Sequence, residues 1–446
     1  MSDRAADTVF ALASGAGRAG VAVIRISGPR AAEAAQRLAG RHLEPRRAEL
    51  CRLHHPVTGD LLDQGLCLVF PEPRSFTGET VAELHVHGGR AVVGAVADAL
   101  LALPGLRPAE PGEFTRRAFR AGKLDLTQVE ALADLVAAET EAQRRQALRQ
   151  RDGGLSLLVA GWRDILVRCL ARLEATLDFP DEDLPAGIEA EVAAQLQEVE
   201  SALVQVLAAG QSGERLRDGL SVVILGAPNA GKSSLLNALA GRDVAIVSAT
   251  AGTTRDIIEV HLDLRGFPVV LADTAGLRES IDSVEAEGVR RALARAQSAD
   301  VRLVVVDGSP DAAESPDSIR LVNDASVVVV SKADLPGSRR IVPGISVPVL
   351  PVSTRTGEGL DALLGHLATV AEAALGGSGA VALTRARHRA AIGDCQGAVR
   401  RALAQADMVL RAEDLRLALR ALGRVVGQVD VEDVLDLIFR EFCIGK

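Results

Sequence analysis

Aromatic side chains are scarce in this chain of 446 residues: they make up 2% of it, with no tyrosine and a single tryptophan, Trp162. The hydrophobic cores must therefore be built from leucine, valine and alanine. Cysteines are also few. The five cysteines are scattered, odd in number and without C-x-x-C spacing, at Cys51, Cys67, Cys169, Cys395 and Cys443. This usage fits a reducing compartment and gives no zinc site.

Long apolar runs are missing as well. No stretch of about eighteen apolar residues occurs, and the first residues lack the basic and apolar segments of a secretory signal. We therefore expect a cytosolic (cytoplasmic) chain with no membrane span. The net charge of −9 argues against a protein that coats nucleic acid non-specifically, although affinity follows clustered charge and not the total. The length predicts two or three domains.

What the chain does contain is a phosphate-binding loop in its expected setting. Residues 222–225 read as a buried strand, residues 226–233 follow the pattern G-x-x-x-x-G-K-S, and a helical period of leucines comes next. Glycines let backbone N–H groups surround a phosphate chain, whose charge the helix N-terminus also favours. Lys232 is expected to reach the β- and γ-phosphates, and Ser233 to bind Mg²⁺. The pattern predicts a nucleotide-binding site.

Two further motifs suit the magnesium ion and the γ-phosphate. Asp273 ends a predicted strand, where its carboxylate can hold Mg²⁺ through water, and Gly276 lets its N–H approach the γ-phosphate. Residues 252–256 (GTTRD) lie where a switch loop belongs, and Thr254 is the residue expected to bind Mg²⁺ when a γ-phosphate is present.

The base is expected to be read by Asp334, in the sequence SKAD that follows another predicted strand. Guanine presents two donors, N1–H and N2–H₂, that match one carboxylate, whereas adenine would leave the carboxylate unpaired. Residues 353–355 supply a loop over the guanine oxygen. Each motif alone is weak, but their order and their positions at strand ends predict a GTPase.

Pattern divides the chain into four segments. Residues 1–121 alternate strands and helices and read as an α+β domain. Residues 122–217 and 377–446 have the apolar spacing of long helices in a bundle. Residues 218–376 read as a doubly wound α/β domain. Its predicted strands are 222–225, 258–264, 268–272, 301–306, 326–330 and 347–352. The simplest interpretation is a P-loop, Ras-like domain inserted into a discontinuous α-helical domain. The basic run at 144–151 is more readily a solvated face than an RNA site.

The motifs PNAGKSSLLN, AGTTRD, DTAGLR and the terminal CIGK together resemble the MnmE (TrmE) family of tRNA modification GTPases, within the TrmE-Era-Septin-like GTPases. The similarity extends over the whole chain, through SFTGE (75–79), HGG (87–89), PGEFTRRAF (111–119) and KLDL (123–126). It implies an N-terminal tetrahydrofolate-binding domain that dimerises, a discontinuous helical domain and an inserted G domain.

The chain departs from related GTPases at two positions. Ser331 stands where most of them have Asn, and its shorter hydroxyl is expected not to span the same two partners, so nucleotide binding should be looser. Leu277 stands where Ras-like enzymes place a water-orienting Gln. Glu285 is the residue expected to act as general base or water positioner, and the alternative is an exposed glutamate at a helix start.

The resemblance further implies potassium-dependent hydrolysis, in which two G domains pair across their switches and K⁺ offsets transition-state charge. Asn229 matches the K⁺-binding asparagine, and the loop with Ser248, Thr250 and Thr253 matches the one that supplies further oxygen ligands. The catalytic set is then Glu285, Asn229, Lys232 and Cys443. Residues expected to contact GTP are Asn229, Ala230, Gly231, Lys232, Ser233, Ser234, Ser248, Ala249, Thr250, Ala251, Gly252, Thr253, Thr254, Asp273, Thr274, Ala275, Gly276, Ser331, Lys332, Asp334, Ser353, Thr354 and Arg355.

The family's folate-contacting positions fall on Arg25, Glu83, Lys123 and Lys446, and the ligand implied is 5-formyltetrahydrofolate. Pattern alone would make Glu83 an exposed strand residue. Cys443 takes part in C5 chemistry on uridine or is a buried cysteine at a helix end, and both readings stay open.

The implied partner is the flavoprotein MnmG, which brings FAD and NADH, and the implied substrate is the wobble uridine (U34) of certain tRNAs, which receives an aminomethyl or carboxymethylaminomethyl group at C5. The alternatives are a regulatory or ribosome-assembly GTPase whose helices only bind partners, and a folate-dependent methyltransferase with a vestigial G domain. The second conflicts with the complete phosphate and magnesium residues.

Overall fold

The computed structural model describes residues 7–178, 187–246, 259–273, 297, 299–312, 319–338, 341–342, 344–376, 383–428, 438 and 445. The chain divides into two compact units, and each is described by itself. The first comprises residues 1–133 and 422–446, and the second residues 134–421. Within the described residues, no helix is long and apolar enough to cross a membrane.

The first unit is built on a mixed sheet. Its strands are β1 (Thr8–Leu12), β2 (Ala22–Ser27), β3 (Glu49–His54), β4 (Leu61–Phe70), β5 (Val81–Val86) and β6 (Leu106–Pro108). Among the residues described, they lie in the order β3-β4-β5-β2-β1-β6, and every pairing is antiparallel except that of β1 with β6. This confirms the α+β pattern. Strands β1, β3 and β6 were not predicted, because they are short and β3 turns only Cys51 and Leu53 into the core.

Helices cover this sheet. On one face, α1 (Ala31–Ala39) and α2 (Arg90–Leu101) pack against strand residues such as Ile24, Ile26 and Leu84. The side chains of Val9 and Ala11 lie in a second cluster with Phe114 of α3 (Glu113–Arg120). This second cluster is also where Phe76 packs. Alternate side chains of β1 therefore point to opposite faces of the sheet and pack into two separate cores.

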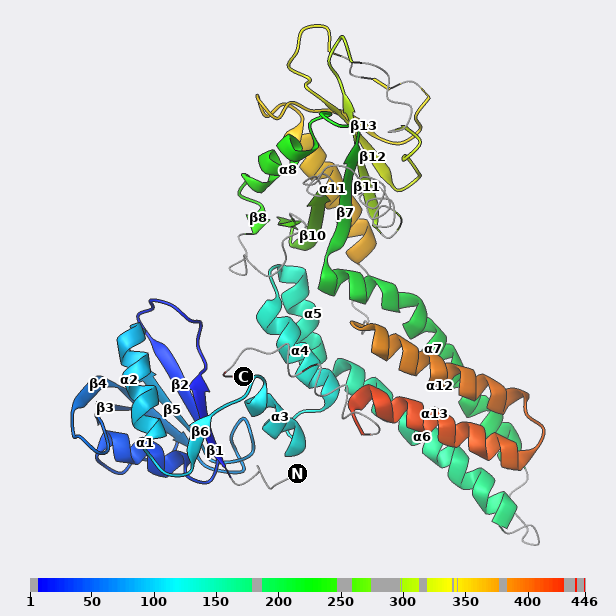
Figure 1. The fold of residues 1–446 in the computed structure, drawn as a ribbon. Helices are drawn as coiled ribbons and strands as arrows, with labels where there is room; N and C mark the ends of the chain where they lie inside the picture. Colours follow the sequence, from blue (N-terminus) through cyan, green and yellow to red (C-terminus); the bar gives the residue numbers. More distant parts are fainter. Residues whose placement is uncertain are drawn as a thin grey trace, which may run out of the picture. The chain divides into compact units, whose positions relative to one another are not determined.

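The second unit contains long helices that flank the nucleotide domain in sequence. They are α5 (Glu141–Arg151), α6 (Gly154–Asp178), α7 (Ile188–Asp218), α12 (Ala386–Ala404) and α13 (Met408–Val426), and α4 (Leu126–Ala137) precedes them. Helix α12, which follows the nucleotide domain, packs side by side with α7, which precedes it (Figure 1). Helical segments that precede and follow the sheet in sequence therefore lie side by side.

The stretch 124–150, which reads as one helical pattern, forms two helices. Helix α4 ends at Ala137, and Thr140 begins α5 with a capping box: its hydroxyl accepts from the backbone N–H of Gln143, whose side chain reaches back to the N-cap. The box satisfies N–H groups that a continuous helix would have used, so the chain turns there. Helix α7 is longer than predicted, since it continues from Leu207 to Asp218.

The nucleotide domain of this unit has a sheet of β7 (Leu220–Gly226), β8 (Ala245–Ile246), β9 (Glu259–Leu264), β10 (Phe267–Asp273), β11 (Val301–Asp307), β12 (Ser326–Ser331) and β13 (Val349–Pro351). Within the described residues the order is β13-β12-β11-β7-β10-β9-β8. Strands β7 and β10 to β13 are parallel, and β9 is antiparallel. All six predicted strands are present, and β8 is additional. Helices α8 (Lys232–Ala240) and α11 (Leu360–Leu375) pack on one face of the sheet.

Candidate functional site

The phosphate loop leaves the sheet at its switch point. Strand β7 lies between β11 and β10, and the chain connects from it to both sides, which is where doubly wound sheets bind ligands. β7 ends at Gly226, whose φ is 146° and whose missing Cβ would lie 2.3 Å from the carbonyl oxygen of Val305. Only glycine fits there, because any side chain would collide with the backbone of β11.

The loop then turns into a helix N-terminus. Asn229, with φ of 61°, is exposed, and Gly231 is the left-handed N-cap of α8. The Lys232 ammonium donates to the carbonyl oxygens of Gly226 (3.0 Å) and Ala227 (2.8 Å). A cation is therefore held over a glycine-lined loop in front of α8, a setting that fits a phosphate chain. Ser233 lies in the first turn of α8, and its hydroxyl is a ligand type that Mg²⁺ accepts.

Ser331 makes a contact that the sequence did not reveal. It is the buried last residue of β12, and its hydroxyl reaches the phosphate loop: Oγ lies 2.7 Å from the carbonyl oxygen of Ala230 and 3.2 Å from that of Val306. The prediction that serine cannot span the two partners of the usual asparagine, and so loosens nucleotide binding, stays a prediction; the hydroxyl lies within hydrogen-bonding distance of two backbone carbonyls. It reaches the loop because Gly231 brings the loop within van der Waals reach of the Ser331 Cβ. Serine therefore ties the base end of the site to its phosphate end.

The predicted base reader is fixed by its neighbours. The Asp334 carboxylate accepts from the hydroxyl of the fully buried Ser353 (2.7 Å) and forms an ion pair with Arg355 (3.0 Å). The hydrogen bond from Ser353 lowers the pKa of Asp334, and the charge of Arg355 adds to this effect. Ser353 Oγ in turn accepts from the backbone N–H groups of Arg355 and Thr356. Asp334, Ser353 and Arg355, which the sequence predicts to surround the guanine base, therefore lie together.

Sequence reasoning missed Asp307, the last residue of β11. It forms an ion pair of 2.6 Å with Lys332, whose φ of 57° lifts the chain out of β12. Burial would raise the pKa of Asp307, but hydrogen bonds from Lys332 and Ser309 outweigh burial and lower it. The signal that could have revealed the Asp307–Lys332 pair is the acidic residue at the end of β11, because β11 is the neighbour of the strand that leads into SKAD.

Several predicted site residues lie outside the described residues: Ser248, Ala249, Thr250, Ala251, Gly252, Thr253, Thr254, Thr274, Ala275, Gly276, Glu285, Cys443 and Lys446. Asp273 is described in its backbone, where it ends β10 opposite Ile224 of β7, in the strand that leads into the phosphate loop. The register thus supports its predicted position next to the phosphates.

In the first unit, two of the predicted folate contacts face each other. Arg25 of β2 is directly opposite Glu83 of β5, and their side chains form an ion pair of 2.9 Å. The Arg25 guanidinium also lies over the rings of Phe76 (5.4 Å) and Phe114 (5.8 Å). Glu83 is 17% exposed, so the pattern-based expectation of an exposed strand residue is wrong. Both phenylalanines were missed, although PGEF and SFTGE contain them.

Of the other two predicted folate positions, Lys123 is described and Lys446 lies outside the described residues. The missing Cβ of Gly78, in SFTGE, would lie 3.4 Å from the Lys123 Cε atom. Gly445, in the terminal CIGK, lies against β1, where its missing Cβ would be 2.0 Å from the carbonyl oxygen of Leu12. Because Ala11, next to Leu12, pairs with Arg25, Gly445 lies on the strand beside the Arg25–Glu83 pair.

The second unit therefore joins a phosphate loop at a switch point to a hydrogen-bonded aspartate suited to guanine. That combination defines a GTPase of the P-loop class. Family models agree with it and cover nearly the whole chain: the model described as "MnmE helical domain" matches residues 126–443, and "GTP-binding protein TrmE N-terminus" matches residues 8–123. The chain belongs to the MnmE family.

Relatives support this assignment. A protein of Rhodospirillum rubrum named "tRNA modification GTPase MnmE" is 56% identical over 99% of each chain, and one of Paramagnetospirillum magneticum with the same name is 55% identical over 99% of this chain and 100% of its own. Among solved structures, Era bound to MgGDPNP and 16S ribosomal RNA nucleotides is 28% identical, with a TM-score of 0.27 over 33% of this chain and 55% of that chain. The T. maritima FeoB G domain is 24% identical, with a TM-score of 0.25 over 34% of this chain and 98% of that one.

Proposed function

We propose that this protein hydrolyses GTP to drive a tRNA modification: together with the flavoprotein MnmG, it adds an aminomethyl or carboxymethylaminomethyl group at C5 of the wobble uridine, U34. The observation that carries the proposal is the identity of more than half of all positions with full-length relatives named for tRNA modification. Since tRNA is the substrate, the protein would work in the cytoplasm.

The nucleotide end of the proposal assigns roles to side chains. Asp334 selects guanine, Lys232 stabilises the β- and γ-phosphates, and Glu285 positions or activates the attacking water. Mg²⁺ would be held by Ser233 and Thr254 and would supply positive charge at the phosphates.

Potassium would be held by Asn229 with Ser248, Thr250 and Thr253 and would add a monovalent charge at the phosphates. The left-handed, exposed Asn229 supports this, because an exposed side chain in the phosphate loop is accessible to an ion. Hydrolysis would then depend on two G domains meeting in the homodimer.

The one-carbon end of the proposal lies in the first unit. Arg25, Glu83, Lys123 and Lys446 would bind 5-formyltetrahydrofolate, with the pterin stacked between aromatic rings such as Phe76 and its donors on the Glu83 carboxylate. The approach of Gly445 to β1 supports a role for the last lysine. Cys443, three residues before Lys446, is the thiol nearest this site in sequence.

For the domains, we propose residues 1–121 as the folate-binding and dimerising domain, 122–217 with 377–446 as the helical domain, and 218–376 as the G domain inserted into it. The packing of α12 on α7 supports the insertion, because the two helices flank the sheet in sequence.

The first test is hydrolysis by the purified full-length chain. GTP should be turned over and ATP should not, and the rate should be clearly higher in KCl than in NaCl at equal ionic strength. Equal rates in the two salts would remove the potassium assignment, and equal use of ATP would remove the guanine assignment.

The second test separates tRNA modification from assembly. Cells lacking the protein are complemented with the wild type or with Cys443→Ser, and tRNA nucleosides are measured by mass spectrometry. Loss of the C5 group at U34 in the null strain supports the proposal, and unchanged wobble uridines favour an assembly GTPase. A Cys443→Ser protein that hydrolyses GTP and still restores the modification would assign the thiol a structural role.

A further inference from the structure

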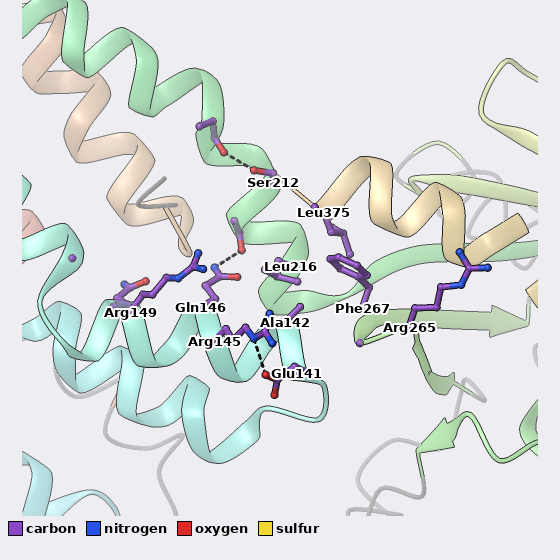
Figure 2. A pocket seen from close by; sticks show the side chains of 16 residues that line it. Glu141, Ala142, Arg145, Gln146, Arg149, Ser212, Leu216, Arg265, Phe267 and Leu375 are labelled. Carbon is purple, nitrogen blue, oxygen red and sulfur yellow. Dashed lines mark hydrogen bonds and ion pairs between the residues drawn. The ribbon is translucent and has the colours of Figure 1, made fainter. Parts of the chain in front are cut away.

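The second unit holds a cavity of about 350 Å³ that none of the roles above uses. Its walls come from α5, from α7, from the turn between β9 and β10, and from the end of α11 (Figure 2). The volume is in the range of small-molecule sites. Phe267 begins β10 at the edge of the sheet opposite the phosphate loop, so the cavity is separate from the nucleotide site.

One side of the cavity is apolar. Leu216 of α7, Phe267 and the buried Leu375 of α11 lie grouped together in Figure 2 and form this side. The turn is fixed in place by the backbone, since the N–H of Ala142 donates to the carbonyl oxygen of Gly266 (3.0 Å). A flat apolar group would therefore find preformed walls.

The opposite side carries a buried donor with no partner. Gln150 of α5 is 4% exposed, lines the cavity, and its Nε2 has no hydrogen-bond partner among the described residues. Gln146, one turn earlier, donates through Nε2 to the carbonyl oxygen of Gly213 (2.9 Å), while its Oε1 has no partner among those residues. A buried amide that lacks a partner is costly, so a rotation of the Gln150 side chain that brings its N–H to an acceptor in the cavity would relieve that cost.

The charge of the lining is positive. Glu141 is already held by Arg144 and Arg145, at 2.8 and 2.7 Å. Within the described part of the chain, no carboxylate pairs with Arg149 or with Arg265, which also line the cavity. Arg149 extends from α5 towards Gln146 in Figure 2. An anion beside Arg149 would meet a free guanidinium and the Gln150 donor together.

We propose that this cavity binds a small organic anion with a flat apolar body. The acid group lies between Arg149 and Gln150, and the body lies against Phe267 and Leu216. Because the wall includes the first residue of β10, whose last residue is Asp273, an occupant contacts both the helices and a strand of the nucleotide site.

The test uses the full-length protein saturated with Mg-GDP, so that the probe cannot occupy the nucleotide site. The probe is 2-naphthoate, and 2-naphthamide is its neutral counterpart of the same shape; binding is measured by isothermal titration calorimetry. We expect one naphthoate per chain and at least about tenfold weaker binding of the amide. Absence of naphthoate binding up to about 1 mM would overturn the proposal.

Variants locate the site. Arg149→Ala and Gln150→Leu should each weaken naphthoate binding at least about fivefold, while Arg144→Ala, on the same helix but outside the cavity, should leave it unchanged. Arg25→Ala should also leave it unchanged, which separates this cavity from the proposed folate site. Circular dichroism and melting temperature check that each variant is folded. Equal affinities of the Arg149 and Arg144 variants, or loss of binding only in the Arg25 variant, would refute the assignment.

Discussion

Replacing Ser331 with alanine tests how the two ends of the nucleotide site are joined. The Ser331 hydroxyl is the group that connects β12 to the phosphate loop, with its oxygen 2.7 Å from the carbonyl oxygen of Ala230. Alanine keeps the backbone of β12 and the packing against Gly231, so the change removes the contacts of the hydroxyl with the carbonyls of Ala230 and Val306 and little else. The carboxylate of Asp334, the proposed guanine reader, is untouched.

The magnitude follows from burial. Ser331 is 6% exposed and Ala230 is 1% exposed, so the carbonyl left behind finds little water, and an unsatisfied buried acceptor costs about 1–3 kcal/mol. Because the loop must be in place before a phosphate chain can bind, we expect most of this cost to appear in nucleotide affinity, as about 5–150-fold weaker binding. GDP and GTP should lose affinity equally, and the preference for guanine over adenine should remain.

The assay is equilibrium binding of fluorescent GDP and GTP analogues, with thermal unfolding measured in parallel. Ser326→Ala is the matched control, since Ser326 is a buried serine at the other end of β12 whose hydroxyl bonds Asn323 instead of the phosphate loop. The control should lose stability and keep nucleotide affinity. If both variants bind nucleotide as the wild type does, the hydroxyl does not couple the loop to β12 and the reasoning fails.

Three further outcomes follow from the same geometry. Asp334→Asn should lower kcat/KM for GTP by about 100-fold or more and allow use of xanthosine triphosphate, whose C2 oxygen accepts from an amide; steady-state kinetics with both nucleotides decides this. Burial would raise the pKa of Glu113, but hydrogen bonds, first that from Arg107 and also that from Arg117, lower it to about 2. Its stabilising effect is therefore present above the unfolded pKa of 4.5 and lost as pH falls towards 2, so Glu113→Gln should flatten the acid unfolding curve in that window. Thr140→Ala removes the N-cap of α5 and should cost about 1 kcal/mol, measured by urea unfolding.

Local pattern predicted most of the nucleotide domain. Valine-rich runs such as residues 326–330 form strands that are buried on both faces, and no helical reading competes with them. The prediction of secondary structure was wrong where local signals conflict. Residues 124–150 keep a helical period across Ala138, yet the Thr140 capping box divides them into α4 and α5. A short strand such as β6 exists only through pairing with β1, which a local pattern does not contain.

The site shows the same division. Phosphate-loop chemistry is encoded within eight consecutive residues, so spacing was enough to predict Lys232 and Ser233. Pairings between distant residues were not accessible in this way. Arg25 and Glu83 are 58 positions apart and are brought together by sheet register. Lys332 and Asp307 are 25 apart; register places Asp307 opposite Ser331, and the turn after β12 brings Lys332 to it.

By itself the sequence determined that this protein binds a guanine nucleotide and to which family it belongs, because those properties depend on residue types at fixed short spacings. Only the tertiary structure decided that Ser331 holds the phosphate loop, that the terminal Gly445 lies on β1, and that α5, α7 and β10 enclose a cationic cavity. Each of these depends on distances between segments far apart in the chain, which are set when the sheets and helices pack.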